Sequence, residues 1–261
     1  IVTKASVGHM DNNVYVLRCT ETGDAVLLDA ANEHDRLLDL CRALNVRSVL
    51  ETHGHWDHIQ AVPQMRDAGY DVHVTAEDAD MLPSYDQILD DDSVIEVGRL
   101  RLHTMLTPGH TPGSMCFLVE GAPVLFSGDT LFPGGPGNTK FPGGDFATII
   151  RSIEDRLFTL PGETRVLPGH GDPTTLATEI PHLQEWIGRG RSRARRPALR
   201  PASLRRDAGP HRGPAGHAPA GPEHPGLGVG RGARRAAGAG RGPPRNAGGR
   251  LQAAHRAVAA V

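Results

Sequence analysis

The C-terminal part of this sequence lacks most of the side chains that build a folded core. Residues 188–261 contain no Lys, Ile, Thr, Met, Cys, Phe, Tyr or Trp, and 57 of these 74 residues are Arg, Ala, Gly or Pro. Such a composition cannot bury enough apolar surface to offset the chain entropy that folding removes. We therefore expect one folded domain over residues 1–188. The tail over residues 189–261 is expected to be either the product of out-of-frame translation or a disordered basic arm that binds nucleic acid or anionic surfaces.

Each part of the chain is also poor in charge of one sign. Residues 1–187 hold 12 Lys and Arg against 28 Asp and Glu, a net charge of −16, and residues 188–261 hold 16 Arg against 2 acidic residues, a net charge of +14. An acidic domain repels a phosphate backbone. The basic tail has none of the aromatic residues on which bases stack. The composition therefore argues against a nucleic-acid partner.

Cysteine pairs and long apolar runs are missing as well. The three cysteines form no C-x-x-C pair, which indicates free thiols in a reducing compartment. No apolar run reaches the roughly 18 residues of a membrane span, and no signal peptide is visible. These absences predict a cytoplasmic protein with no membrane partner. The residues give no indication of an oligomeric state.

Residues 1–187 alternate between strand and helix patterns. Apolar runs at 13–19 and 25–30 are typical of strands, whereas apolar residues recur at helical spacing over 33–44 and 146–158. Another strand, over 46–52, runs directly into a stretch rich in histidine. The mixture of both element types along the whole length predicts an α/β domain in which sheets pack on each other.

The stretch H-G-H-W-D-H, residues 53–58, concentrates three histidines and an aspartate. Residues two apart share a face only on an extended chain, so His53 and His55 can both face one cavity at the end of the strand before them. Asp57 and His58 begin the next predicted helix and face a neighbouring point. We interpret this arrangement as parts of two adjacent metal sites, because a catalytic zinc ion typically takes three protein ligands and a water.

Three further ligand-type residues follow predicted strands, each beside a glycine. They are His110 in T-P-G-H-T, Asp129 in S-G-D-T and His170 in P-G-H-G. Glycine lets the backbone approach a site closely. The repeated pattern therefore predicts that all three complete the two metal sites.

The ordered motifs H-x-H-x-D-H, G-H, G-D-T-L-F and G-H-G resemble those of the metallo-β-lactamase-fold hydrolases. The G-D-T-L-F motif is most similar to the glyoxalase II-type, or hydroxyacylglutathione hydrolase-like, branch. The resemblance covers residues 1–187 and implies an αββα sandwich with a binuclear site at the sheet edge. It further implies that the first metal is bound by His53, His55 and His110, that the second is bound by Asp57, His58 and His170, and that Asp129 bridges both.

Charge supports the chemistry that this resemblance implies. Two divalent ions carry more positive charge than the carboxylates of Asp57 and Asp129 neutralise. The remaining positive charge lowers the pKa of a bridging water from 15.7 toward about 7. We expect zinc, with iron and manganese as alternatives. The predicted function is metal-dependent hydrolysis by a metal-bridging hydroxide, with Asp57 as the catalytic residue that orients it and takes its proton. The expected substrate is a small thioester or related acyl compound.

Two other functions fit the same fold. A persulfide dioxygenase of this type uses a single iron bound by two His and one Asp, and a nuclease uses the metals on phosphodiesters. The acidic domain argues against the nuclease. Metal analysis separates the hydrolase from the dioxygenase.

The sequence allows two different roles for each of three further residues. Lys140 is the only Lys or Arg between Arg101 and Arg151, so it either anchors a substrate carboxylate or is an exposed loop residue. Asp29 either accepts a hydrogen bond from the second nitrogen of a metal-binding histidine or is a turn residue before the helix. Trp56 either forms a wall of the substrate pocket or packs beside it.

Overall fold

We describe a computed structural model of the chain, which covers residues 1–194 and 259–260. The expected tail over 189–261 falls outside this range except for residues 189–194, which belong to the last helix, and residues 259–260. The first sheet has the strand order β15 (Ala259–Ala260), β1 (Val2–Val7), β2 (Asn12–Arg18), β3 (Ala25–Leu28), β4 (Val46–Leu50), β5 (Asp71–Thr75) and β6 (Gln87–Leu89).

A second sheet faces the first. Its strands run in the order β14 (Thr174–Thr175), β13 (Arg165–Pro168), β10 (Val124–Gly128), β9 (Met115–Val119), β8 (Leu100–Leu106) and β7 (Val94–Val97). A short hairpin of β11 (Leu131–Phe132) and β12 (Gly135–Pro136) follows β10. The helices are α1 (His34–Leu44), α2 (Val62–Asp67), α3 (Phe146–Ser152), α4 (Leu176–Glu179) and α5 (Leu183–Ala194).

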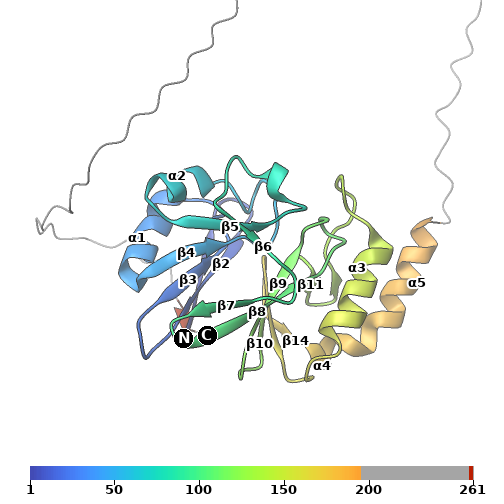
Figure 1. The fold of residues 1–261 in the computed structure, drawn as a ribbon. Helices are drawn as coiled ribbons and strands as arrows, with labels where there is room; N and C mark the ends of the chain where they lie inside the picture. Colours follow the sequence, from blue (N-terminus) through green and yellow to red (C-terminus); the bar gives the residue numbers. More distant parts are fainter. Residues whose placement is uncertain (195–258, 261) are drawn as a thin grey trace, which may run out of the picture. The chain divides into compact units, whose positions relative to one another are not determined.

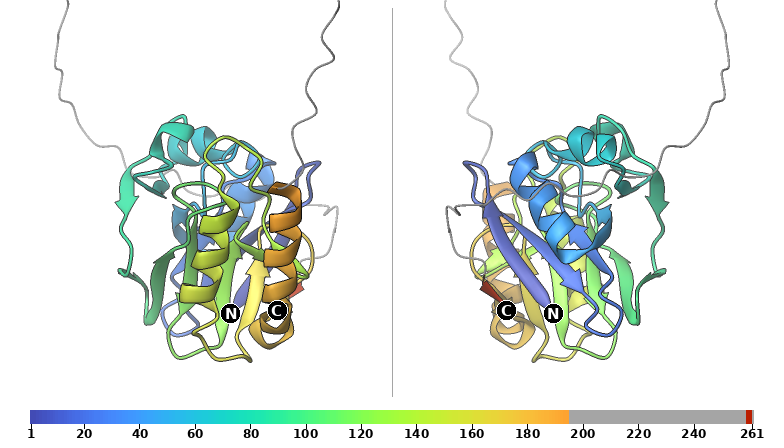
Figure 2. Two further views of the ribbon diagram at one scale, coloured as in Figure 1. Left: turned by 90° about the vertical axis from the view of Figure 1, so that its right-hand side faces the viewer. Right: turned by 90° about the vertical axis from the view of Figure 1, so that its left-hand side faces the viewer.

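Three apolar clusters hold the layers together. One joins the outer face of the first sheet to α1 and α2, through residues such as Leu37, Cys41 and Met65. The second, around Phe117 and Phe126, lies between the sheets. The third packs α3 and α5 on the outer face of the second sheet. This is the predicted αββα sandwich, with one helical layer on each side of the paired sheets (Figures 1 and 2).

Sequence patterns explain why the helices lie where they do. Leu37 and Cys41, four residues apart, are buried on one side of α1, and the left-handed Asn45 (φ 59°) ends that helix. Asp145 begins α3 by accepting a hydrogen bond from the Thr148 backbone N–H. The helix predicted over 146–158 is confirmed, and α3 continues directly into a π-helical turn, Ile153–Leu157.

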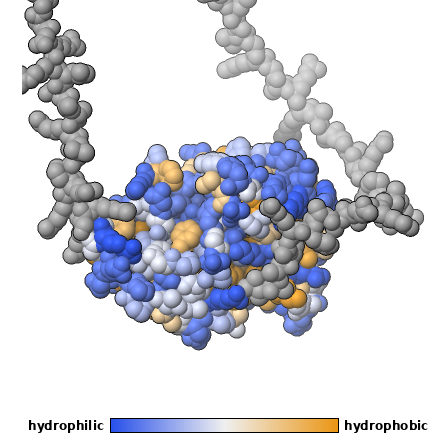
Figure 3. Space-filling view, turned by 180° about the vertical axis from the view of Figure 1, so that it is seen from behind, coloured by the Kyte–Doolittle hydropathy of each residue, from blue (hydrophilic) through white to orange (hydrophobic). Residues whose placement is uncertain are grey.

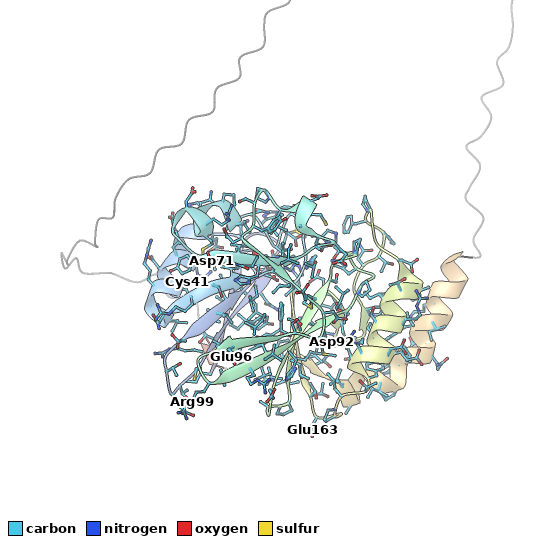
Figure 4. The ribbon with its side chains drawn as sticks, in the orientation of Figure 1. Cys41, Asp71, Asp92, Glu96, Arg99 and Glu163 are labelled. Carbon is cyan, nitrogen blue, oxygen red and sulfur yellow. The ribbon has the colours of Figure 1, made fainter. Side chains whose placement is uncertain are left out.

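The strand directions bring several chain segments to one edge of the sandwich. Strands β3 and β4 run parallel, as do β10 and β13, so their carboxyl ends meet at the same edge. The loops carrying the histidines follow these ends. Arg99, between β7 and β8, and Glu163, before β13, mark the opposite end (Figure 4). The surface of the described residues seen from behind is largely hydrophilic, with separate apolar spots (Figure 3).

Candidate metal centre

The residues predicted to bind the first metal lie together. His53 and His55 follow β4, and His110 lies in the loop between β8 and β9. The Nε2 atoms of His53 and His110 are 3.2 Å apart, and Nδ1 of His55 is 2.8 Å from His110 Nε2. Three imidazole nitrogens therefore converge on one point.

The second predicted group converges beside the first. His58 Nε2 and His170 Nε2 are 3.2 Å apart, and His170 Nε2 is 3.3 Å from Asp57 Oδ2. His58 Nε2 is 3.6 Å from the same oxygen. Asp57, His58 and His170 thus place one nitrogen or oxygen each within 4.8 Å of one another.

Asp129 lies between the two groups. Its Oδ2 is 3.5 Å from His110 Nε2 and 3.7 Å from His170 Nε2, while its Oδ1 is 3.6 Å from His58 Nε2. Oδ1 is buried and has no hydrogen-bond partner among the described residues. Gly169 is needed for this arrangement, since a Cβ atom there would lie 2.3 Å from Asp129 Oδ1. One carboxylate therefore reaches both groups.

The protonation states suit metal ligands. Burial, together with the neighbouring histidines, lowers the pKa of His53, and burial and His110 lower the pKa of His55 to about 4. Burial also lowers the pKa of His110. These three imidazoles are therefore neutral at physiological pH, which is the form that binds metal.

The second group holds an excess of negative charge. Burial alone would lower the pKa of His58, but Asp129 and Asp29 outweigh it and raise this pKa to about 9. Burial would raise the pKa of Asp57, yet His170 and His58 bring it below the ordinary value. A bound divalent cation would compensate this concentration of carboxylates. The donor set therefore fits a divalent metal.

The remaining nitrogens of the histidines are held by protein oxygens. Nδ1 of His58 donates to Asp29 Oδ2 at 2.8 Å, and Nδ1 of His110 donates to the Asn138 carbonyl at 2.7 Å. Nδ1 of His170 donates to the Met10 carbonyl at 3.1 Å. Such bonds fix the ring orientation and the tautomer.

Asp29 also holds the loop before His53. Its Oδ1 accepts from the Thr52 backbone N–H at 2.7 Å and its Oδ2 from the Thr52 hydroxyl at 2.9 Å. The Thr52 hydroxyl lies 3.0 Å from His53 Nδ1. Asp29 adopts a left-handed φ of 64° in the loop after β3, and its hydrogen bonds to His58 and Thr52 agree with the first of its two interpretations.

Sequence reasoning missed two polar residues at this centre. Asn12 donates from Nδ2 to Asp57 Oδ2 at 3.0 Å. Asp78, which is fully buried, accepts from the backbone N–H groups of Gly54 at 2.9 Å and Gly113 at 2.7 Å and from the Thr111 hydroxyl at 2.6 Å. No pattern marked either residue, because their partners are distant in sequence.

Exposed apolar side chains surround the centre. Trp56 is 55% exposed and stacks on His9, with ring centroids 5.9 Å apart. Phe141 is 53% exposed, and its ring lies edge-on to His55 at 5.3 Å. Lys140, next to Phe141, lines a cavity of about 560 Å³ beside the centre.

Comparisons with known proteins agree with this geometry. Residues 7–170 match the sequence pattern of the Metallo-beta-lactamase superfamily. The chain is 32% identical over 200 residues to "Probable metallo-hydrolase YqgX" of Bacillus subtilis, covering 66% of this chain and 91% of that protein. It is 32% identical over 178 residues to "Hydroxyacylglutathione hydrolase GloC" of Haemophilus influenzae, covering 60% of this chain and 84% of that protein.

A solved structure supports the fold as well. "TTHA1623 in a di-iron-bound form" superposes with a TM-score of 0.61 at 29% identity, covering 68% of this chain and 96% of that one. In residues 1–194 and 259–260, no helix has the length and apolar character needed to span a membrane. From the motif order, the αββα sandwich and the matched residues, the chain belongs to the metallo-β-lactamase superfamily of metallo-hydrolases.

Proposed function

We propose that this protein hydrolyses thioesters or related small acyl compounds with two divalent metal ions. His53, His55 and His110 would hold one ion, Asp57, His58 and His170 the other, and Asp129 both. The observation that carries the proposal is the position of the Asp129 carboxylate, within 3.7 Å of a histidine nitrogen from each group. The relatives with hydrolase names support the reaction class.

The residues of this chain have separate tasks in such a reaction. When bound, two divalent ions would supply a water of lowered pKa and stabilise negative charge on the acyl oxygen. The Asp57 carboxylate orients the attacking water and accepts its proton. Asn12 donates to Asp57 Oδ2 at 3.0 Å and so fixes the direction in which this carboxylate faces. Asp29 and Thr52 keep His58 and His53 in their binding orientation.

The mononuclear dioxygenase is the competing function, because a dioxygenase of this fold carries the same motifs, and the number of bound metal ions separates the two. A single iron bound by two His and one Asp would use three of these residues, whereas seven converge here in three overlapping groups. We also propose zinc as the resident ion. The di-iron form of the solved relative makes iron the main competitor.

Metal analysis of the purified full-length protein tests the proposal. We expect about two equivalents of a divalent metal, loss of thioester hydrolysis after chelation, and recovery when zinc is returned. One equivalent of iron with oxygen uptake on a persulfide substrate would contradict the proposal and establish the dioxygenase. A panel of acyl thioesters then identifies the substrate.

Lys140 is proposed to anchor a carboxylate of the substrate. Such an anchor binds the ground state and the transition state equally, so Lys140→Ala should raise KM while kcat stays nearly unchanged. A charge-assisted hydrogen bond is worth about 1.5–3 kcal/mol, which corresponds to a roughly ten- to hundredfold change in KM. The measurement compares thioesters with and without a carboxylate on the thiol half. Arg151→Ala, at an exposed position of α3, is the matched control. Equal responses of both substrate series would make Lys140 an ordinary loop residue.

A further inference from the structure

A cavity of about 560 Å³ lies between α3, α5 and the loop of residues 134–140. Its volume is within the range of small-molecule sites. The side chains that line it are Asn138, Thr139, Lys140, Phe146, Trp186 and Arg189, with backbone from four glycines and Pro136. The family model matches residues 7–170, so Trp186 and Arg189 lie beyond the residues that it matches.

Two aromatic residues, Phe146 and Trp186, are among those that line the cavity. Trp186 is only 2% exposed, and its Nε1 is buried without a hydrogen-bond partner among the described residues. A Cβ atom on Gly135 would lie 3.8 Å from this Nε1, so the indole N–H adjoins the space that the glycine leaves. An indole N–H is a hydrogen-bond donor only, and burial without an acceptor is unfavourable.

Both charged side chains that line the cavity are cationic. They are Lys140 and Arg189, and no Asp or Glu is among the lining residues that the structure describes. Arg189 keeps donors available, because its contacts with Glu185 Oε1 at 3.6 Å and with the Gly134 carbonyl at 3.5 Å are long. The domain has few basic residues, and two of them line this one cavity. The cavity therefore favours the binding of an anion.

The cavity shares a wall with the metal centre. Asn138 lines the cavity, and its carbonyl accepts the hydrogen bond from His110 Nδ1 at 2.7 Å. Gly137 also lines it and lies against the Asp129 backbone, since a Cβ there would overlap the Asp129 carbonyl oxygen. A molecule in the cavity would therefore be separated from His110 and Asp129 only by Asn138 and Gly137.

We propose that this cavity binds a small carboxylate with an aromatic body. Its ring packs between Phe146 and Trp186, and its carboxylate accepts from Arg189 and Lys140. Two sources share this chemistry, namely the remote end of a substrate and a separate small molecule. This binding site is proposed separately from the hydrolysis, because binding of a ligand to the cavity can be measured without turnover of a substrate.

Tryptophan fluorescence gives a direct test, because the whole sequence contains two tryptophans. In the full-length, metal-loaded Trp56→Phe variant, Trp186 is the sole tryptophan. We expect a saturable change of its emission with 4-phenylbutyrate and a much weaker response to 4-phenylbutan-1-ol. Arg189→Gln in the same background should weaken 4-phenylbutyrate binding by roughly ten- to hundredfold and leave the alcohol unaffected. Arg151→Gln is the control and should change neither.

Arg189 is suited to this test because its side chain is 57% exposed, so its replacement does not disturb a core. Thermal melting confirms that each variant is folded. Absence of a saturable response, equal binding of the acid and the alcohol, or unchanged binding by Arg189→Gln would overturn the proposal. If the protein hydrolyses thioesters, competitive inhibition by 4-phenylbutyrate identifies the remote end of the substrate, and noncompetitive inhibition identifies a separate ligand. The fluorescence result stands even if no thioester is hydrolysed.

Discussion

Replacing Asp129 with alanine is expected to remove most of the bound metal from both groups of ligands. Its two carboxylate oxygens lie 3.5–3.7 Å from nitrogens of His110, His170 and His58, so no other residue at the centre serves both groups in this way. Loss of a residue that hydrogen-bonds to a metal ligand typically costs roughly 10- to 100-fold in metal affinity or activity. Loss of a ligand itself should cost more. We therefore expect kcat to fall by at least about 100-fold.

Metal content after gel filtration, measured by plasma mass spectrometry, provides the readout. His110→Ala should empty mainly the first group, because His110 converges with His53 and His55, whereas Asp57, His58 and His170 form a separate group. Asp80→Ala, at an exposed position, is the control for general effects of removing a carboxylate. Two full metal equivalents in the Asp129→Ala protein would show that the carboxylate does not bridge.

Strand and helix patterns predicted an α/β domain with packed sheets, and the family resemblance implied the αββα layers and the grouping of the seven residues that converge. Strand periodicity places the ends of β4, β10 and β13, and a ligand-type residue directly after a strand end has little freedom to lie elsewhere. His53, Asp129 and His170 therefore meet at one edge, as the motif order predicted. The parallel pairing of β10 with β13 completes the argument, because it places Asp129 and His170 at neighbouring strand ends.

Contacts between distant loops could not be predicted in this way. Asn12 and Asp78 carry no motif, and their roles depend on the packing of segments 24 to 45 residues away in the sequence. The cavity was missed for the same reason. Lys140 was considered an isolated cation because it is the only Lys or Arg between Arg101 and Arg151, yet Arg189, 49 positions later, lines the same cavity. Periodicity describes single elements, whereas such sites are formed by the contacts between them.

Asp78 joins the two loops that carry the first group of proposed metal ligands. Gly54, one of its partners, lies between His53 and His55, and two others, Thr111 and Gly113, follow His110. The carboxylate thus fixes the relative position of two chain segments that must present nitrogens to one ion. It also satisfies three buried donors, each of which would cost about 1–3 kcal/mol if left without an acceptor.

We therefore expect Asp78→Ala to lower the free energy of unfolding of the metal-free protein by at least about 3 kcal/mol, a large part of the 5–15 kcal/mol of a typical domain. Asp78→Asn should cost less, since the amide oxygen still accepts while its NH₂ group cannot. Urea denaturation measures both variants, with Asp39→Ala on the exposed side of α1 as the control.

Metal titration separates this positioning effect from general instability. In the folded Asp78→Asn protein, affinity at the group of His53, His55 and His110 should fall by roughly 10- to 100-fold. The group of Asp57, His58 and His170 should change less, because Asp29, Asn12 and the Met10 carbonyl hold it independently of Asp78. An equal loss at both groups, or none at either, would mean that Asp78 stabilises the fold without positioning the ligands.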